Sequence, residues 1–171
     1  VPDEVVIETL VRAANKDAIA DAAAKTDRAF KAGAIAVGAS CEVTTMPGYL
    51  PALSEKADAS VLTAAEIAAQ TSEKDYQIVQ EDTHAYSGGS TDVGDVQHLQ
   101  PVLTFNTGGK VSGLHSVDFD IVDEELAYVV TAKIFALSAY RLLRDRAVKA
   151  KEIVANYQPI FTKEEYIKYM D

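Results

Sequence analysis

The chain has 171 residues, of which 48% are hydrophobic and 25% are charged, a composition typical of a folded globular protein. Its formal net charge of −10 argues against a nucleic acid or an anionic membrane as the main partner, because both are bound through clustered Lys and Arg. The single cysteine, Cys41, excludes an internal disulfide and fits a reducing compartment, so we expect a cytoplasmic protein. No apolar run approaches the roughly 20 residues that span a bilayer, and the first ten residues lack the basic and apolar regions of a signal peptide.

The first fifty residues are predicted to form a strand, a helix and a second strand. Residues 4–13 are rich in β-branched and apolar side chains, which favours a strand. Residues 16–37 are rich in Ala, which favours a helix, and Gly38 suits a left-handed cap at its end. Residues 40–46 resemble a short strand, and the turn-forming sequence "MPGYLP" follows.

A boundary is predicted near residues 47–53, where Pro47, Gly48 and Pro51 cluster. Beyond it the pattern alternates between helical and extended segments. In chain order we expect a helix over 54–71, a short strand over 75–81, a strand over 101–107, a turn and a short extended piece over 108–114, a helix over about 123–145, a shorter helix over about 146–156 and a last helical turn that Thr162 and Glu165 cap.

The segment "GGSTDVGDVQHLQP", residues 88–101, allows two interpretations. Gly, Ser, Thr and Asp are the residues that make turns and helix caps, so the segment is compatible with a plain connector. Alternatively, successive small residues let backbone N–H groups approach a ligand and hold a carboxylate or an oxyanion. Asp92 and Asp95 are three residues apart and would point the same way if the segment runs into a helical turn.

A histidine in "GLHSVDFD", His115, follows the strand predicted at 101–107 and sits beside a glycine, where its side chain can reach a cleft. Such a histidine can ligate a metal or polarise a carbonyl. Catalytic zinc needs three protein ligands, and His84, His98 and His115 have no standard ligand spacing. We therefore do not expect a metal site made entirely of these residues. If His115 is a ligand, its partners come from elsewhere.

These two motifs, followed by the Ala-rich segment "AKIFALSAYRLL", resemble the C-terminal part of a metal-dependent amidohydrolase of the aminoacylase and carboxypeptidase-type metallopeptidase family. Within that family the chain is most similar to the branch of the aminobenzoyl-glutamate utilisation protein B. The upstream sequence "VVIETLVRAANKDAI", continued through "GASCEVTTMPGYLP", resembles the second half of the family's inserted lid or dimerisation domain.

The resemblance implies an α/β (α+β) architecture in two parts. Residues 1–50 would be a β-α-β piece of the lid, and residues 51–171 the C-terminal half of a three-layer α-β-α catalytic domain. It also implies hydrolysis of the amide bond of an N-acyl amino acid, such as an aroyl-glutamate or a dipeptide, with zinc or manganese bound in the complete enzyme. We expect the chain to form a homo-oligomer or to associate with the missing N-terminal half.

The same resemblance implies roles for six residues. His115 matches the last metal ligand of the family, Arg12 would meet a substrate carboxylate, and the cleft would be lined by Ser90, Thr91, Asp92 and Asp95. For Arg12 an ordinary surface ion pair is the alternative.

The chain departs from the family because the N-terminal half, which carries the other metal ligands and the general base, has no counterpart here. Glu124 and Glu125 open a helix and are better explained as charges favourable to a helix N-terminus than as the family's Glu-Glu pair. Alternatively, the chain is a non-catalytic truncated paralogue or subunit that acts as a binding module.

Overall fold

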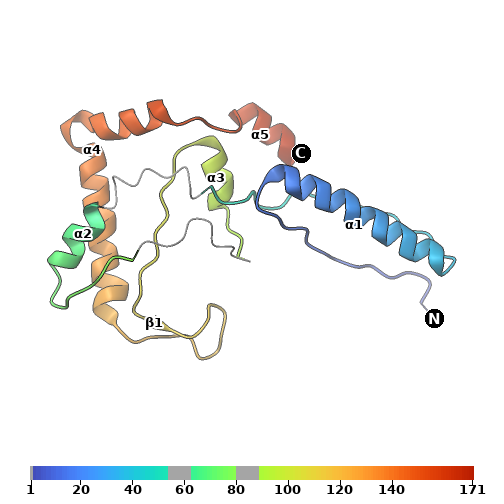
Figure 1. The fold of residues 1–171 in the computed structure, drawn as a ribbon, viewed down its shortest axis with the longest axis horizontal. Helices are drawn as coiled ribbons and strands as arrows, with labels where there is room; N and C mark the ends of the chain where they lie inside the picture. The colour runs from blue at the N-terminus through green and yellow to red at the C-terminus, as the bar shows by residue number, and fades with distance from the viewer. Residues whose placement is uncertain (1, 54–62, 80–88) are drawn as a thin grey trace. The chain divides into compact units, whose positions relative to one another are not determined.

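The computed structural model describes residues 2–53, 63–79 and 89–171. The fold is rich in helix and holds one small antiparallel sheet, which makes it a mixed α and β fold (Figure 1). Its elements in chain order are α1 (Lys16–Ala36), α2 (Thr63–Gln70), α3 (Val93–Leu99), β1 (Lys110–Val111), β2 (Asp120–Ile121), the π-helix η3 (Glu125–Val130), α4 (Thr131–Asn156) and α5 (Lys163–Met170).

The chain divides into two compact units. Unit 1 comprises the described parts of residues 1–52 and 86–99 together with 160–171, and so contains α1, α3 and α5. Unit 2 comprises the described parts of residues 53–85 together with 100–159, and so contains α2, the sheet, η3 and α4. The boundary predicted near residues 47–53 coincides with the first change of unit, but residues 86–99 and 160–171 return to unit 1.

The helix predicted over 16–37 is confirmed as α1. The side chain of Asn15 accepts a hydrogen bond from the Ala18 N–H (2.9 Å) and so satisfies one of the free donors of the first turn. At the other end Gly38 has a φ of +74°, the left-handed conformation that ends many helices. Both ends are therefore set by local signals that are visible in the sequence.

The strands predicted over 4–13, 40–46 and 101–107 are wrong as strands. These segments have no regular secondary structure, and neither do residues 75–79. Residues 80–81 of the strand predicted over 75–81 lie outside the described residues, as does 54–62 of the helix predicted over 54–71. Apolar, β-branched runs favour an extended chain, but a strand also needs a hydrogen-bonded neighbour, and the described residues pair only β1 with β2.

The core of unit 2 lies between α2 and α4. Ala68 of α2 is buried against Val130 and Ile134, which lie one helical turn apart. The small side chains of α2 allow the two helix backbones to approach closely, since Ala64 and Ala68 are both fully buried. The partly buried hydrophobic residues packed around this centre are Ala65, Tyr76, Phe105, Leu126 and Leu137.

The long helix predicted over 123–145 and the shorter one over 146–156 are both present. They run together as η3 and α4, with non-helical backbone angles from Arg144 to Ala147. The predicted break between residues 145 and 146 therefore falls inside the observed one. The last predicted helical turn is α5, where the Thr162 hydroxyl accepts from the Glu165 N–H and the Glu165 carboxylate accepts from the Thr162 N–H.

The short sheet is a hairpin that stands just before η3. Lys110 pairs with Ile121 and Val111 pairs with Asp120. Gly109 precedes it with a φ of +85°, and a Cβ at this position would lie 2.6 Å from the Asp123 carbonyl oxygen. Only glycine fits both the backbone angle and the space here. This glycine holds the base of the hairpin against the start of the long helix.

Candidate functional site

Five of the six predicted site residues lie in two features, the polar motif that contains α3, in unit 1, and the hairpin loop of unit 2; the sixth, Arg12, lies in the irregular segment before α1. Within the motif, Asp95 is buried, with 7% of its surface exposed. Its Oδ1 accepts a hydrogen bond from the Leu50 N–H (3.3 Å), and the side chain also bonds Tyr166 of α5. Burial, together with the Asp95 charge, raises the pKa of the Tyr166 phenol. The aspartate therefore joins three segments of unit 1.

The close packing around Gly94 explains why the residue in the middle of this motif is a glycine. A Cβ at this position would lie 2.0 Å from the Leu50 carbonyl oxygen and 3.1 Å from the Pro51 carbonyl carbon. The backbone of α3 thus passes directly against residues 50–51, which is possible only without a side chain. The close approach brings Asp95 within reach of the Leu50 N–H.

The end of the motif is also buried. Gln97 and His98 are only 1% and 2% exposed. The His98 Nδ1–H donates to the Gly94 carbonyl (2.8 Å), and the imidazole stacks on the Phe161 ring at a centroid distance of 6.0 Å. The His98 carbonyl accepts from the N–H groups of Ile160 (2.9 Å) and Phe161 (3.1 Å). His98 therefore connects α3 to the segment that leads into α5.

The first part of the motif lies at the surface. Ser90, Thr91 and Asp92 are all exposed. The Thr91 hydroxyl donates to the Asp92 carboxylate (3.2 Å) and accepts from the Val93 N–H (3.4 Å), which is the arrangement of a helix cap. Of the four residues predicted to line a cleft, three are free to meet a solute and Asp95 is engaged inside unit 1.

His115 lies on the exposed loop between β1 and β2. Its φ is +66°, and Ser112 in the same loop has a φ of +65°. The loop is closed by two turns, from the Ser116 N–H to the Gly113 carbonyl (3.2 Å) and from the Phe119 N–H to the Ser116 carbonyl (3.2 Å). The left-handed conformation is uncommon for residues other than Gly, and histidine is among those enriched there. The imidazole is exposed and stands just before the long helix, as the sequence predicted.

The described residues do not supply a complete metal site. Within residues 2–53, 63–79 and 89–171, no group of three His, Cys, Asp or Glu side chains is placed to hold a metal ion. His115 belongs to unit 2, whereas Arg12, which is exposed, and the motif of α3 belong to unit 1. A zinc site requires three protein ligands, so His115 alone does not fit one.

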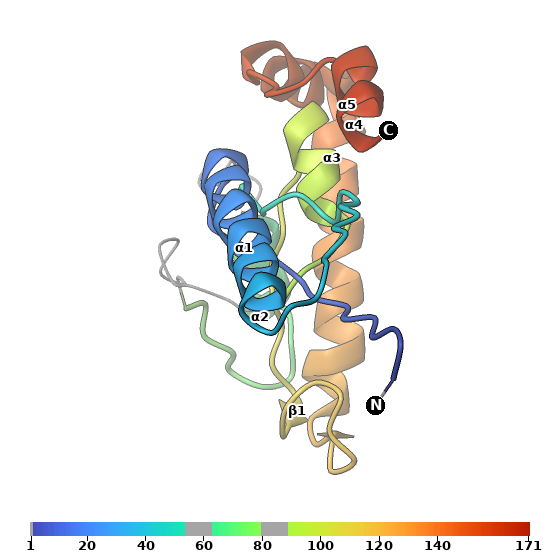
Figure 2. The same cartoon turned by 90° about the vertical axis from the view of Figure 1, so that its right-hand side faces the viewer.

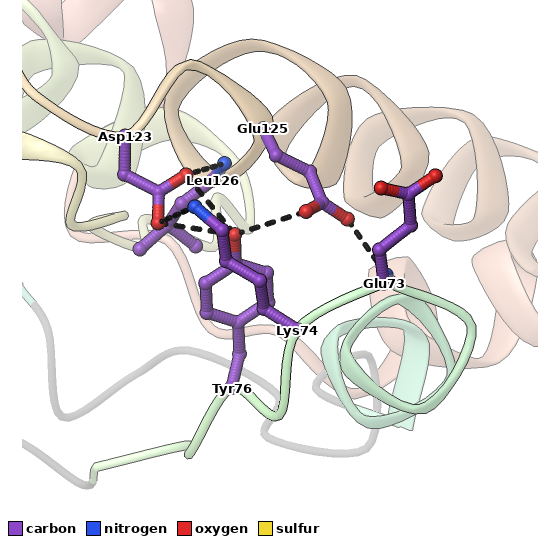
Figure 3. A network of polar contacts seen from close by, with 6 residues as sticks. All are labelled: Glu73, Lys74, Tyr76, Asp123, Glu125 and Leu126. Carbon is purple, nitrogen blue, oxygen red and sulfur yellow. Dashed lines mark hydrogen bonds and ion pairs between the residues drawn. The ribbon is translucent and has the colours of Figure 1, made fainter.

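A polar network that was not predicted from the sequence lies at the start of η3 (Figure 3). Its centre is Asp123, whose Oδ1 and Oδ2 lie 3.1 and 3.2 Å from the Tyr76 hydroxyl. Oδ2 also pairs with the Lys74 ammonium (2.8 Å), and Oδ1 accepts from the Leu126 N–H (3.1 Å). The hydrogen bond from the Leu126 N–H caps the helix. Of the contacts in this network, only this cap has a local sequence signal, an Asp three residues before a helical residue.

Glu125 extends the same network to the end of α2. Its carboxylate accepts from the Glu73 N–H (2.9 Å) and from the Tyr76 hydroxyl (3.4 Å). About two turns further along, the Lys133 ammonium donates to the Thr71 carbonyl (3.0 Å), an acceptor at the end of α2. Residues 71–76 are thus held along the first turns of the long helix. Glu125 has a structural partner here, which supports its separation from a catalytic Glu-Glu pair.

The charges of the network shift its pKa values. The hydrogen bond from Lys74 and the one from the Leu126 N–H hold the pKa of the Asp123 carboxyl below its usual value of 3.8. The hydrogen bond between Lys74 and Asp123 also raises the pKa of the Lys74 ammonium. Burial raises the pKa of the Tyr76 phenol, and its hydrogen bond to Asp123 acts in the same direction. All three shifts favour the anionic carboxylate beside a cation and a neutral phenol, so the network is assembled near neutral pH.

No family profile matches this chain, and no match was found among the curated proteins or the solved structures. The amidohydrolase assignment therefore stays a prediction.

Among the residues that the structure describes, one helical stretch, Glu125–Asn156, is long and apolar enough to cross a membrane, with a mean hydropathy of 1.4 over an 18-residue window of which 11% is buried. The core helix of a soluble protein passes the same test. Here Val130 and Ile134 of that stretch form the core of unit 2 with Ala68.

Proposed function

We propose that this chain is the C-terminal portion of a metal-dependent amidohydrolase that cleaves an N-acyl amino acid, of the aroyl-glutamate or dipeptide type. Residues 1–50 would belong to its lid, and residues 51–171 to the second half of a three-layer α-β-α catalytic domain. The observation that carries the proposal is the exposed imidazole of His115, held in the loop of the hairpin that precedes the long helix. In the family that the sequence resembles, the last metal ligand has this place.

The segments that lack a strand neighbour support the proposal. Residues 4–13 and 101–107 have strand-forming sequences but no regular structure. Val5, Val6, Ile7 and Leu10 are between 66% and 78% exposed, although strands of such composition are normally buried in a sheet. In a complete catalytic domain and lid, further strands would pair with these segments and cover their side chains.

In this proposal the chain supplies part of the site. His115 would bind the metal through one imidazole nitrogen, and at least two more ligands would come from residues outside this chain. Ser90, Thr91 and Asp92 would offer hydroxyl and carboxylate groups to the polar end of the substrate. Arg12 would pair with its carboxylate, for which a guanidinium is the best match. The bound metal would polarise the amide carbonyl.

The first test is metal content and amidase activity on one purified sample, with aminobenzoyl-glutamate and added zinc or manganese. We expect no turnover and less than one equivalent of tightly held metal, with weak zinc binding that broadens the His115 ring signals in an NMR titration. The informative variant is His115→Asn, since Asn tolerates the left-handed backbone. Leu114→Ala, a change at an exposed neighbour in the same loop, is the control.

Loss of the weak zinc binding in His115→Asn but not in Leu114→Ala would support the proposal. Zinc binding that both variants retain would contradict the ligand role of His115. Turnover that depends on His115 would overturn the claim that the essential ligands lie outside the chain.

The second candidate is a non-catalytic binding module. It is favoured by one observation: within the described ranges, no three ligand-type side chains come together. The reading frame upstream of Val1 separates the two candidates. An in-frame region with metal-ligand histidines and acidic residues favours the hydrolase, whereas a start codon directly before Val1 favours the module.

A further inference from the structure

We propose that residues 144–147 form a two-state bend in α4. In the bent state, seen here, three successive residues are left-handed; in the straight state they are helical and α4 is one continuous helix. Figures 1 and 2 show the bend as a corner in the orange ribbon of α4.

The backbone angles define the bend. Arg144 has an extended ψ of 164°, and Asp145, Arg146 and Ala147 follow with φ values of 53°, 60° and 59° and ψ values of 40°, 33° and 34°. None of these residues is glycine. For an L-residue other than Gly, the left-handed conformation is roughly fivefold to thirtyfold less populated than the right-handed one. Three in succession are rare, because left-handed residues normally occur singly.

The local sequence prefers the straight state. The segment "RLLRDRAVKAKE", residues 141–152, contains no Gly and no Pro, and its Leu, Arg, Lys, Ala and Glu residues are good helix formers. Two helices are predicted here, with a break between residues 145 and 146, but neither Gly nor Pro marks that break. The preference of this segment for a helix opposes the observed left-handed turn, so we expect the straight state to be populated beside the bent one.

Beside the bend lies an open surface pocket of about 510 Å³ in unit 2. It is lined by Thr63 at the start of α2 and, along α4, by Arg141, Leu142, Arg144, Asp145, Val148, Lys149 and Glu152. In a continuous helix the backbones of Arg141 and Glu152 would be about 16 Å apart along the axis, so the lining residues would be spread along one straight helix. Straightening the helix would therefore change this pocket and what lies beside Thr63.

The ion pairs seen beside the bend are exposed, so they stabilise the bent state only weakly against the local preference for a helix. Arg144 and Asp145 are 3.6 Å apart, as are Lys149 and Glu152, and all four side chains are at least 40% exposed. Pairs of this kind contribute little to stability and weaken in salt. We therefore expect salt to shift the populations toward the straight state.

The bend lies within α4, more than two helical turns before the helix ends at Asn156. Residues 157–159 follow α4, and residues 160–171, with α5, belong to unit 1. The state of the bend sets the direction in which the chain leaves α4.

The test compares two substitutions at one exposed position, Arg146→Gly and Arg146→Ala. Both remove the same side chain and charge, but only Gly adopts the left-handed conformation freely, and Ala is the best helix former. The readout is the pair of spin-label distances between Tyr140→Cys and Val154→Cys, in a chain whose Cys41 is replaced by Ser. Both labelled residues are exposed, at 64% and 62%. The straight state places their backbones about 21 Å apart.

We expect two distances in the labelled parent chain, and a ratio of bent to straight that is at least fivefold higher in Arg146→Gly than in Arg146→Ala. The ¹³Cα shifts of residues 145–147 should move in parallel from left-handed to helical values. As a control, Lys151→Gly and Lys151→Ala, at an exposed position with helical angles in both states, should give the same ratio. Equal ratios for the two Arg146 variants, or an equally large difference at Lys151, would overturn the proposal.

Discussion

Gly94 is the residue on which the packing of unit 1 depends most directly, because its backbone lies against that of Leu50. Replacing it with Ala would place a Cβ 2.0 Å from the Leu50 carbonyl oxygen, and backbone atoms on both sides would have to move. We expect Gly94→Ala to reduce the free energy of unfolding by about 1–3 kcal/mol, the usual cost of forced overpacking. Urea unfolding followed by circular dichroism measures this change.

Gly48→Ala is the control for that experiment. Gly48 lies in the same unit, and nothing lies within 4 Å of a Cβ built there. We expect a change in unfolding free energy of less than about 1 kcal/mol. Equal losses for the two alanine variants would contradict the close contact of Gly94 with residues 50–51.

We expect opposite effects on stability from substitutions of Asp95 and Asp92, although the sequence suggested the same role for both. Asp95→Ala would leave the buried Leu50 N–H without its carboxylate acceptor and remove a partner of Tyr166, at a cost of about 1–3 kcal/mol. Asp92→Ala changes an exposed side chain and should cost less than about 0.5 kcal/mol. If thermal unfolding shows the two variants to be equally stable, Asp95 is not the structural link described above.

The motif illustrates what a sequence conveys at the residue scale. Its composition predicted a turn or a ligand loop, and both readings assumed exposure. The structure buries the second half, because Gly94 allows α3 to reach residues 50–51 and because Phe161 covers His98. Those partners lie more than 40 residues away in one direction and more than 60 in the other, so no local pattern could have indicated them.

At the element scale, the start of the long helix depends on the charge of Asp123. Its pKa is lower in the folded chain than the usual 3.8, chiefly through the hydrogen bond from Lys74. A group with a lowered pKa adds stability that is complete well above its unfolded value and is lost as the pH falls through the folded value. The parent chain should therefore lose part of the stability of unit 2 as the pH falls below about 4.

In Asp123→Asn the stability should depend less on pH below about 4, and it should be lower than in the parent chain near neutral pH. The measurement is the midpoint of urea unfolding between pH 2 and pH 7, followed by the Tyr76 signals of unit 2 in NMR spectra. Asp118→Asn removes one exposed carboxylate from the hairpin loop and should leave the acid limb as it is in the parent chain. If Asp123→Asn loses as much stability at acid pH as the parent chain does, the pH dependence belongs to other carboxylates.

The helices α1, α4 and α5 were predictable in this chain, whereas α3 was not predicted and, of the extended segments, only the short piece within 108–114 contains a strand, β1. The difference has a physical reason. The signals that set α1, α4 and α5 are local: the Asn15 cap, the left-handed Gly38, the apolar residues four apart and the pair Thr162–Glu165. A strand requires a neighbour to which its N–H and C=O groups bond. Residues 4–13 and 101–107 carry the composition of strands, but the described residues offer them no neighbour.

At the scale of the whole molecule, a strong negative charge opposes a large exposed apolar surface. The net charge of −10 favours solubility through self-repulsion. Against this, the unpaired segment 4–13 exposes Val6 at 78% and Leu10 at 77%. Exposed, unpaired apolar segments of this kind promote association. We therefore expect the chain to self-associate at micromolar concentration, in a manner that salt strengthens by screening the charge.

Sedimentation velocity across a concentration series tests this expectation with a matched pair of variants. Val6→Lys combined with Leu10→Lys, and Glu8→Lys alone, raise the net charge by the same two units within the same segment. Only the first variant removes apolar surface, so it should shift the chain toward the monomer, whereas Glu8→Lys should associate at least as strongly as the parent because its net charge is less negative. A parent chain that sediments as a single monomer at these concentrations, or two variants that behave alike, would show that residues 4–13 do not drive association. In that case the exposed apolar face of α4, with Phe135 at 62% and Leu143 at 66% exposed, becomes the segment to substitute next.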